Sequence, residues 1–129
     1  MSVARKKVDV AWAAGFWEGE GSCGMRGKKR FNRVQKRWYK PQLRVELVQK
    51  YPQPLNKIKE MYSQTCNVYY DKYNKCYRFI LSAAQASIFL TEILPYVQSI
   101  YKREQITSSL KEHNKIARKF SGKGGTCGS

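Results

Sequence analysis

The chain has 129 residues, enough for one domain with a single modest core. Its 42% hydrophobic and 13% aromatic content exclude a disordered chain, and no apolar run approaches the roughly 20 residues that cross a bilayer, so we expect no membrane partner. The 25 Lys and Arg residues against 9 Asp and Glu residues give a net charge of +16, which destabilises the compact state by self-repulsion unless a polyanion relieves it. Nucleic acid is the commonest such partner, either for a protein that reads it or for a ribosomal or packaging protein that only neutralises phosphate.

The first periodic segment predicts one helix over residues 9–18, with Asp9 as its N-cap and Gly19 as its C-terminal stop. Small residues recur along one side of this helix, because residues three and four apart are neighbours on a helix surface. They are Ala11, Gly15 and Gly19, with Ala14 adjacent. A stripe without side chains lets another backbone approach very closely.

The pattern changes to period two between residues 21 and 48. Apolar side chains alternate with glycine or polar ones around Cys23 and Met25, and again between Leu43 and Leu47. This alternation predicts two strands, each with one apolar and one polar face. The polar and basic stretch from Arg30 to Lys40 lies between them and is expected to be a long hairpin tip.

The second half of the chain predicts a helix, two shorter strands and two further helices. Pro52 and Pro54 open the helix, which is expected to end near Gln64. Strands follow at 66–71 and 76–81, Ser82 caps the next helix, Pro95 interrupts it, and the last helix spans 102–120. Residues 121–129 are expected to form a flexible, Gly-rich tail. The whole order is typical of an α+β fold, in which residues 1–120 form a single domain with a four-stranded antiparallel sheet covered by helices on one face.

Four cysteines lie at positions 23, 66, 76 and 127. The chain has no Cys-x-x-Cys pair and only 1 histidine, so a structural zinc site is not expected. Cys66 and Cys76 could face each other across a hairpin, but small buried thiols in a reducing, intracellular compartment are the favoured interpretation.

The positive charge is concentrated in the first strand pair and its connection, because residues 21 to 45 include no acidic residue. A two-stranded ribbon fits the major groove of B-form DNA, where Arg prefers guanine, Gln prefers adenine and a carboxylate accepts from cytosine. A polar face that mixes these side chains favours base reading, whereas a face that only grips phosphates or RNA is the alternative. We predict DNA contacts from Arg26, Lys28, Arg30, Arg33, Lys36, Arg37, Lys40, Gln42, Arg44, Glu46 and Arg78.

The stretch Ala13-Ala-Gly-Phe-Trp-Glu-Gly-Glu-Gly21 resembles the signature of the LAGLIDADG homing-endonuclease family. Ala14-Gly15 matches its Ala-Gly, and residues 18–21 match its acid-small-acid-Gly ending, with glutamates where aspartates are more usual and Ala13 where leucine is typical. Downstream, three segments resemble the family's leucine-proline helix, the Lys-x-x-Gln start of its next helix, and the polar pair that ends the second strand: Leu90–Val97, Lys102–Gln105 and Gln49-Lys50. The resemblance covers about Asp9 to Lys115 and implies the family's αββαββα fold.

A chain with one such motif implies a homodimer, in which the motif helices pair across a two-fold axis. The resemblance and the small-residue stripe assign this interface to Ala11, Ala14, Gly15 and Glu18. Glu20, just past the predicted helix end, is an expected ligand of Mg²⁺ or Mn²⁺, since a helix C-terminus favours a cation and carboxylate oxygens suit these metals. The resemblance implies the carbonyl of Gly19 as an additional ligand. For Glu18, helix capping or packing near the interface is favoured over metal ligation.

Two further catalytic roles follow from the resemblance. Lys102 is expected to stabilise charge on the scissile phosphate. It stands seven residues after Pro95, a wider spacing than is expected for the family, so Arg103 is the alternative. Gln49 is expected to orient the attacking water.

The resulting hypothesis is a sequence-specific endonuclease that cuts double-stranded DNA with a divalent metal, at a site formed by two copies of the chain. The alternative is a non-catalytic nucleic-acid binder on the same fold, such as an intron splicing helper (a maturase) or a ribosome-associated RNA binder. A protein that only binds has no chemical need for a carboxylate at the helix end, so Glu20 favours catalysis. A protein–protein adaptor does not explain the charge of +16.

Overall fold

The structure is a computed structural model, which describes residues 5–27, 30–63 and 65–124. Its elements are α1 (Lys7–Glu20), β1 (Gly21–Arg26), β2 (Arg30–Asn32), β3 (Arg37–Tyr39), β4 (Gln42–Gln49), α2 (Gln53–Tyr62), β5 (Tyr69–Asp71), β6 (Cys76–Ser82), α3 (Ala83–Ile93), the 3-10 helix η1 (Leu94–Tyr96) and α4 (Ile100–Gly124). This order confirms the predicted α+β architecture and adds two short strands within the first hairpin connection.

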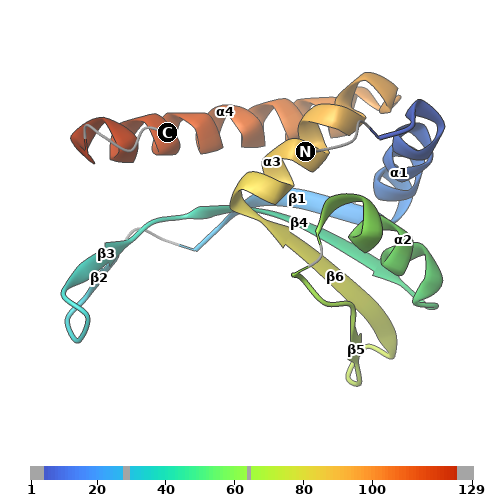
Figure 1. The fold of residues 1–129 in the computed structure, drawn as a ribbon, viewed down its shortest axis with the longest axis horizontal. Coiled ribbons are helices and arrows are strands. Elements are labelled where there is room, and N and C mark those ends of the chain that lie inside the picture. The colour runs from blue at the N-terminus through green and yellow to red at the C-terminus, as the bar shows by residue number, and fades with distance from the viewer. Residues whose placement is uncertain (1–4, 28–29, 64, 125–129) are drawn as a thin grey trace.

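The main sheet has four antiparallel strands in the order β1-β4-β6-β5. Its register sets Cys23 opposite Val45 and Val45 opposite Leu81, so buried side chains of three adjacent strands line up on one face. The helices lie over this face, with α1, α3 and α4 above the sheet in the view of Figure 1. Side chains alternate along a strand, so the residues between the buried ones point to the opposite face, which we call the outer face.

Helix α1 packs with Val10, Ala13, Ala14 and Trp17 against the core. This spacing puts all of them on one side of a helix. The helix is longer than predicted at both ends: Lys6 is its N-cap, and it continues through Glu20 to a cap at Gly21, whose N–H donates to the Trp17 carbonyl. The sequence prediction was therefore wrong in making Asp9 the N-cap and Gly19 the stop.

The connection between β1 and β4 is a hairpin arm with its own pairing. Strands β2 and β3 form a separate two-stranded sheet, with Arg30 opposite Tyr39 and Asn32 opposite Arg37. Gly27 adopts a φ of 90° where the chain leaves β1, a conformation that favours glycine and turns the arm away from the main sheet. In Figure 1 this arm extends to the left, as does the C-terminal half of α4.

Helix α4 begins at Ile100 and continues to Gly124. It is therefore longer than the predicted helix, and residues 121–124 are helical, contrary to the expected tail from 121 to 129; residues 125–129 lie outside the described residues. Ser82 is the N-cap of α3 as predicted, but its hydroxyl makes no capping hydrogen bond. Helix α2 ends at Tyr62, and Gln64, its predicted end, lies outside the described residues.

The described cysteines, Cys23, Cys66 and Cys76, are free thiols, so Cys66 and Cys76 form no disulfide across the second hairpin. Cys23 is buried as predicted, whereas Cys66 and Cys76 are only partly buried. Among the described residues, no helix combines the length and the apolar character needed to cross a membrane.

Candidate active site and nucleic-acid interface

Helix α1 ends at an exposed carboxylate. Glu20 is the last helical residue, and both Glu20 and Gly19 are exposed. Among the described residues, the Glu20 carboxylate has no hydrogen-bond or ion-pair partner, although the chain carries a large excess of cations. The last carbonyls of a helix also lack partners within the helix, so this end offers several oxygen acceptors close together.

Lys102, in the first turn of α4, lies beside this helix end. Its Nζ donates to the Gly21 carbonyl at 2.8 Å and stands 4.8 Å from the centroid of the Trp17 ring. Trp17 Nε1 in turn donates to the Ser22 carbonyl at 3.3 Å. The two residues that follow Glu20 are therefore held by side-chain donors, Gly21 by the lysine and Ser22 by the indole.

Arg103, the alternative to Lys102, is engaged elsewhere. Its Nη1 donates to the carbonyls of Leu94 and Val97, at 3.2 and 3.0 Å, and so ties the 3-10 helix to the start of α4. Lys102 is thus the residue of this pair that the structure places beside the end of α1.

Glu18 turns toward α4 within its own chain. Its two carboxylate oxygens accept hydrogen bonds from the backbone N–H groups of Gln98 and Ser99, at 3.0 and 2.8 Å. These groups immediately precede α4, where free N–H groups and the positive end of the helix dipole favour a carboxylate. The arrangement agrees with the capping interpretation, and both oxygens of Glu18 are engaged within the chain, unlike those of Glu20.

Gln49 ends β4 on the same face of the sheet as Leu47, by alternation. Its Oε1 accepts a hydrogen bond from the Lys50 backbone N–H at 2.7 Å. The amide NH₂ is the part of Gln49 that remains for another partner.

The small-residue stripe of α1 is partly exposed. Gly15 and Gly19 are exposed, Ala11 is half-buried, and Val8, one turn before, is 70% exposed. An added Cβ at Gly15 or Gly19 would meet nothing within 4 Å, so the fold of one chain does not require glycine at either position. The prediction that Ala14 belongs to the interface was wrong, because its side chain is fully buried in the core of its own chain.

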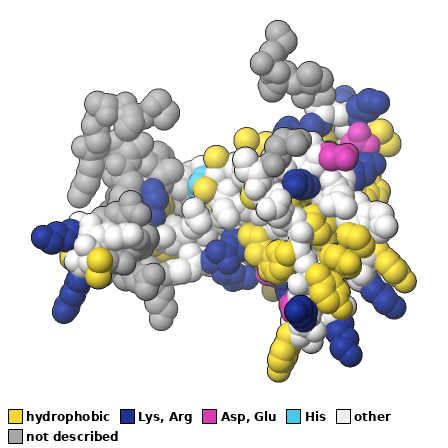
Figure 2. Space-filling view, turned by 60° about the horizontal axis from the view of Figure 1, so that its bottom comes forward, with side chains coloured by type: hydrophobic (Ala, Val, Ile, Leu, Met, Phe, Trp, Pro, Cys, Tyr) yellow, Lys and Arg dark blue, Asp and Glu magenta, His cyan; other side chains and the backbone are white. Residues whose placement is uncertain are grey.

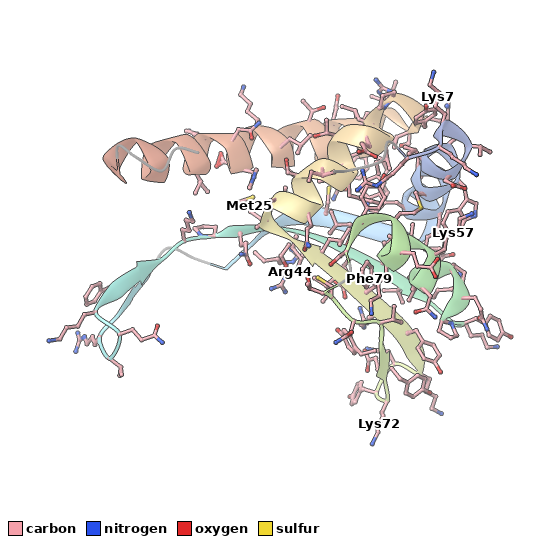
Figure 3. All side chains as sticks on the ribbon, viewed as in Figure 1. Lys7, Met25, Arg44, Lys57, Lys72 and Phe79 are labelled. Carbon is pink, nitrogen blue, oxygen red and sulfur yellow. The ribbon has the colours of Figure 1, made fainter. Side chains whose placement is uncertain are left out.

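The outer face of the main sheet carries the predicted base-reading side chains. The register sets Arg26 opposite Gln42, Ser22 opposite Glu46 and Val48 opposite Arg78. Arg44 lies between Gly24 and Ser82, and its Nε is buried without a hydrogen-bond partner in the described part of the chain. Figure 3 shows the labelled Arg44 side chain below the sheet, away from the helices, and Figure 2 shows Lys and Arg side chains scattered across this side of the molecule.

Two of these side chains are paired with each other. Arg78 Nη1 binds the Glu46 carboxylate, and Arg78 Nε donates to Asp71 Oδ2 at 2.8 Å. Hydrogen bonds from Asn74 and Arg78 hold the pKa of Asp71 well below its usual range, and the carboxylates raise the pKa of Arg78. Glu46 and Arg78 are therefore not independent readers, and Asp71, which the sequence analysis missed, belongs with them.

The remaining predicted contacts lie on the hairpin arm. Arg33 and Lys36 are exposed in its turn, and Lys40 is exposed where the chain returns to the main sheet. Arg30 and Arg37 belong to β2 and β3, whose backbone alone is described at these positions, and Lys28 lies outside the described residues.

Two further residues near the helix end were not predicted. The sequence analysis gave no role to Trp17, although its position four residues before Gly21 places it one helical turn from the motif's last glycine. Gln105 lies one turn after Lys102, and its Oε1 is buried without a partner among the described residues. Its place in the Lys-x-x-Gln match was the available signal.

The chain thus combines an α+β fold with an exposed carboxylate and a lysine at one helix end and a polar face on its main sheet. The chain belongs to the LAGLIDADG endonuclease family, which matches residues 13–103. No curated protein matches the sequence.

Solved structures share the fold at low sequence identity. The homing endonuclease I-CvuI, in complex with its target in the presence of Ca, is 20% identical with a TM-score of 0.68, over 84% of this chain and 68% of that one. The archaeal intron-encoded homing endonuclease I-Vdi141I, complexed with DNA, is 17% identical with a TM-score of 0.66, over 88% of this chain and 72% of that one. The group I intron-encoded homing endonuclease I-CeuI, complexed with DNA, is 16% identical with a TM-score of 0.66, over 92% of this chain and 61% of that one. At these identities the likeness shows the fold alone, and it confirms the predicted fold class.

Proposed function

We propose that this member of the family is a sequence-specific, divalent-metal-dependent endonuclease of double-stranded DNA, with an active site formed by two copies of the chain. The observation that carries the proposal is the exposed, unpartnered carboxylate of Glu20 beside Lys102 at the end of α1. An exposed glutamate without a partner adds nothing to the fold of a single chain. It is suited to a ligand that the chain meets later.

The donor set at this helix end fits a hard cation such as Mg²⁺ or Mn²⁺. A carboxylate and backbone carbonyls are oxygen ligands, which these ions prefer. Within the described residues, no three His, Cys, Asp or Glu side chains gather in one place, so a single chain brings only the Glu20 carboxylate and the Gly19 carbonyl. A second copy would double this set. When bound, a divalent cation supplies Lewis-acid activation of water and stabilisation of the leaving oxygen.

Lys102 and Gln49 are the further catalytic candidates. Lys102 Nζ is half-buried against Gly21 and Trp17, which holds its ammonium at the helix end, where a scissile phosphate would need a positive charge. The amide NH₂ of Gln49 can donate to the water or phosphate, because its carbonyl oxygen is engaged by the Lys50 backbone.

The exposed side of α1 supports pairing of two copies. Each glycine inside a helix costs about 0.5–1 kcal/mol relative to alanine, and neither Gly15 nor Gly19 is required by its own chain's packing. Close approach of a second backbone is the usual use of such a surface. Pairing along Ala11, Gly15 and Gly19 brings the two ends of α1, and so the two Glu20 carboxylates, toward one axis.

The outer face supports duplex DNA as the substrate. It mixes Arg26, Gln42 and Arg44, whose side chains have different preferences among base edges in the major groove. The exposed Arg33 and Lys36 at the turn of the arm are suited to phosphates. I-CvuI, I-Vdi141I and I-CeuI are each homing endonucleases solved in complex with DNA.

The test is cleavage of a randomised duplex library in Mg²⁺. We expect discrete cuts at a preferred sequence that EDTA abolishes. Glu20→Gln should reduce cleavage by roughly 100-fold or more, the scale expected for loss of an essential polar group, while duplex binding is retained. Glu104→Gln is the matched control, because Glu104 is an exposed glutamate of α4 that also has no partner among the described residues.

Two different results would refute the proposal. If no duplex is cut and the chain binds structured RNA tightly, it is a non-catalytic binder on the same fold. If Glu20→Gln cuts as well as the unchanged chain, Glu20 does not belong to the active site.

A further inference from the structure

Asp71, Arg78 and Glu46 form a cluster, which we call the Arg78 cluster, across three adjacent strands of the outer face. Strand β6, which carries Arg78, lies between β4 and β5. Arg78 Nε donates to Asp71 Oδ2 at 2.8 Å on one side, and Arg78 Nη1 binds Glu46 on the other. The side chains of Arg78, Glu46 and Asp71 keep 22%, 24% and 19% of their surface exposed, so the cluster is open to a ligand on this face.

Asp71 is itself held in place by the turn between β5 and β6. Its Oδ1 accepts hydrogen bonds from the backbone N–H groups of Tyr73 and Asn74, at 3.0 and 3.1 Å, and its Oδ2 accepts one from Asn74 Nδ2 at 2.8 Å. These donors hold the pKa of Asp71 well below its usual range, because hydrogen bonds to the carboxylate favour its charged form. The carboxylate that orients Arg78 is thus anchored to the backbone.

Arg78 retains enough donors for a base. A guanidinium has five N–H groups in a planar fork, and the two bonds within the cluster use one on Nε and one on Nη1. The protons of Nη2, which has no partner in the described part of the chain, and the second proton of Nη1 remain. Two parallel donors match the O6 and N7 acceptors of guanine in the major groove.

The contact with Arg78 also changes how the Glu46 carboxylate can bind a base. A free carboxylate in the groove would accept from cytosine N4, but an ion-paired one is already occupied by a charged donor. Arg44 and Arg26, by contrast, have no carboxylate partner in the described part of the chain. Of the described arginines on the outer face, Arg78 is therefore the one whose conformation is fixed before DNA arrives.

We propose that the Arg78 cluster reads one guanine in each half of the target, with Arg78 as the specificity-determining residue and Asp71 as the positioning residue that fixes its fork. This inference rests on the proposed function, in that the outer face faces the duplex. The entropy cost of ordering a long side chain is already met in the free protein, so the contact favours discrimination between bases.

The test selects bound duplexes from a randomised library in EDTA, so that cleavage plays no part. The unchanged chain should prefer guanine at one position of each half-site, and Arg78→Ala should relax that position by roughly 5- to 150-fold. Asp71→Asn should relax the same position by a smaller factor without lowering total duplex binding, because it removes a negative charge. Arg44→Ala should relax a different position and leave the Arg78 position unchanged.

Asp9→Asn is the matched control, because it breaks an ion pair that lies away from the outer face. This pair joins Asp9 Oδ1 of α1 to Lys57 Nζ of α2 at 3.3 Å. The substitution should leave the base profile unaltered. If Asp71→Asn lowers the melting temperature but leaves the base profile unchanged, Asp71 is only a turn-stabilising residue and the inference is overturned. If the unchanged chain selects no sequence at all, the proposed function is refuted. If it selects a preferred sequence that Arg78→Ala leaves intact, only the inference about Arg78 is refuted.

Discussion

Replacing Gly21 by alanine tests how the helix end is built. Gly21 has an ordinary extended backbone, with φ of −121°, so alanine brings no backbone strain. Its Cβ, however, would lie 2.3 Å from Trp17 Cδ1, 2.9 Å from Trp17 Nε1 and 3.0 Å from Leu47 Cδ2. These atoms belong to fully buried side chains that cannot move freely. Overpacking of this kind costs about 1–3 kcal/mol, and each kcal/mol lowers the melting temperature by about 2–8 °C, depending on domain size.

The same change should also disturb the candidate active site. A displaced Trp17 ring shifts the surface on which the Lys102 ammonium rests, 4.8 Å from the ring centroid. We therefore expect Gly21→Ala to lose cleavage activity even well below its melting temperature.

The assay is thermal unfolding followed by circular dichroism, together with cleavage at a temperature where both variants are folded. Gly24→Ala is the matched control, because Gly24 lies in the same strand and its added Cβ would meet only Arg26 Nη1, at an ordinary 3.9 Å. Equal melting temperatures for the two variants would refute the steric argument. A destabilised Gly21→Ala that cleaves normally when folded would refute the link from Trp17 to Lys102.

Two further changes address the dimer and the pH dependence of stability. Gly15→Leu should give folded monomers in sedimentation, because an added Cβ at this position meets nothing within 4 Å in the described part of its own chain, whereas the leucine side chain would occupy the surface proposed for a second copy. An unaltered dimer would rule out this interface. The sole histidine, His113, has its pKa lowered from the ordinary value by burial and by the nearby Lys40 cation. The unfolded chain therefore binds this proton more readily than the folded one, so stability is present above the unfolded pKa and is lost as the pH falls below about 6.5. His113→Gln should flatten the fall in melting temperature between about pH 7.5 and pH 5.5, and an unchanged slope would assign it to other groups.

Much of the fold was predictable because its signals are local. The strands β1 and β4 and the helix α1 follow from period-two and helical alternation of apolar residues, and their buried sides match that pattern. The arm strands β2 and β3 were not predicted, because they have three residues each and no apolar alternation to mark them. The length of α4 was underestimated because composition alone suggested a tail where the helix continues.

The sequence predicted which residues belong to the candidate site better than it predicted the contacts that they make. The motif located Glu20, and the later match located Lys102, but periodicity could not place Ala14. A small residue on a helix suits either a surface stripe or the core, and only the position of the sheet decides, which here buries Ala14 completely. The Arg78 cluster was invisible for a related reason. Its ion pairs join residues 46, 71 and 78, which the sheet register brings together.

The spacing of the two motif acids explains how one chain can build half of a site. Successive residues of an α-helix are rotated by about 100°, so Glu18 and Glu20 point to nearly opposite sides of α1. Glu18 turns inward and caps the start of α4 through the N–H groups of Gln98 and Ser99. The Ser99 hydroxyl accepts a hydrogen bond from the Lys102 N–H at 3.3 Å, and Lys102 then reaches the Gly21 carbonyl. One glutamate thus fixes the helix that presents the lysine, while the other is left exposed for a ligand. Replacement of Glu18 should consequently displace Lys102 while leaving Glu20 in place. The two acids of the motif therefore have different roles, because one positions the lysine and the other supplies the exposed carboxylate.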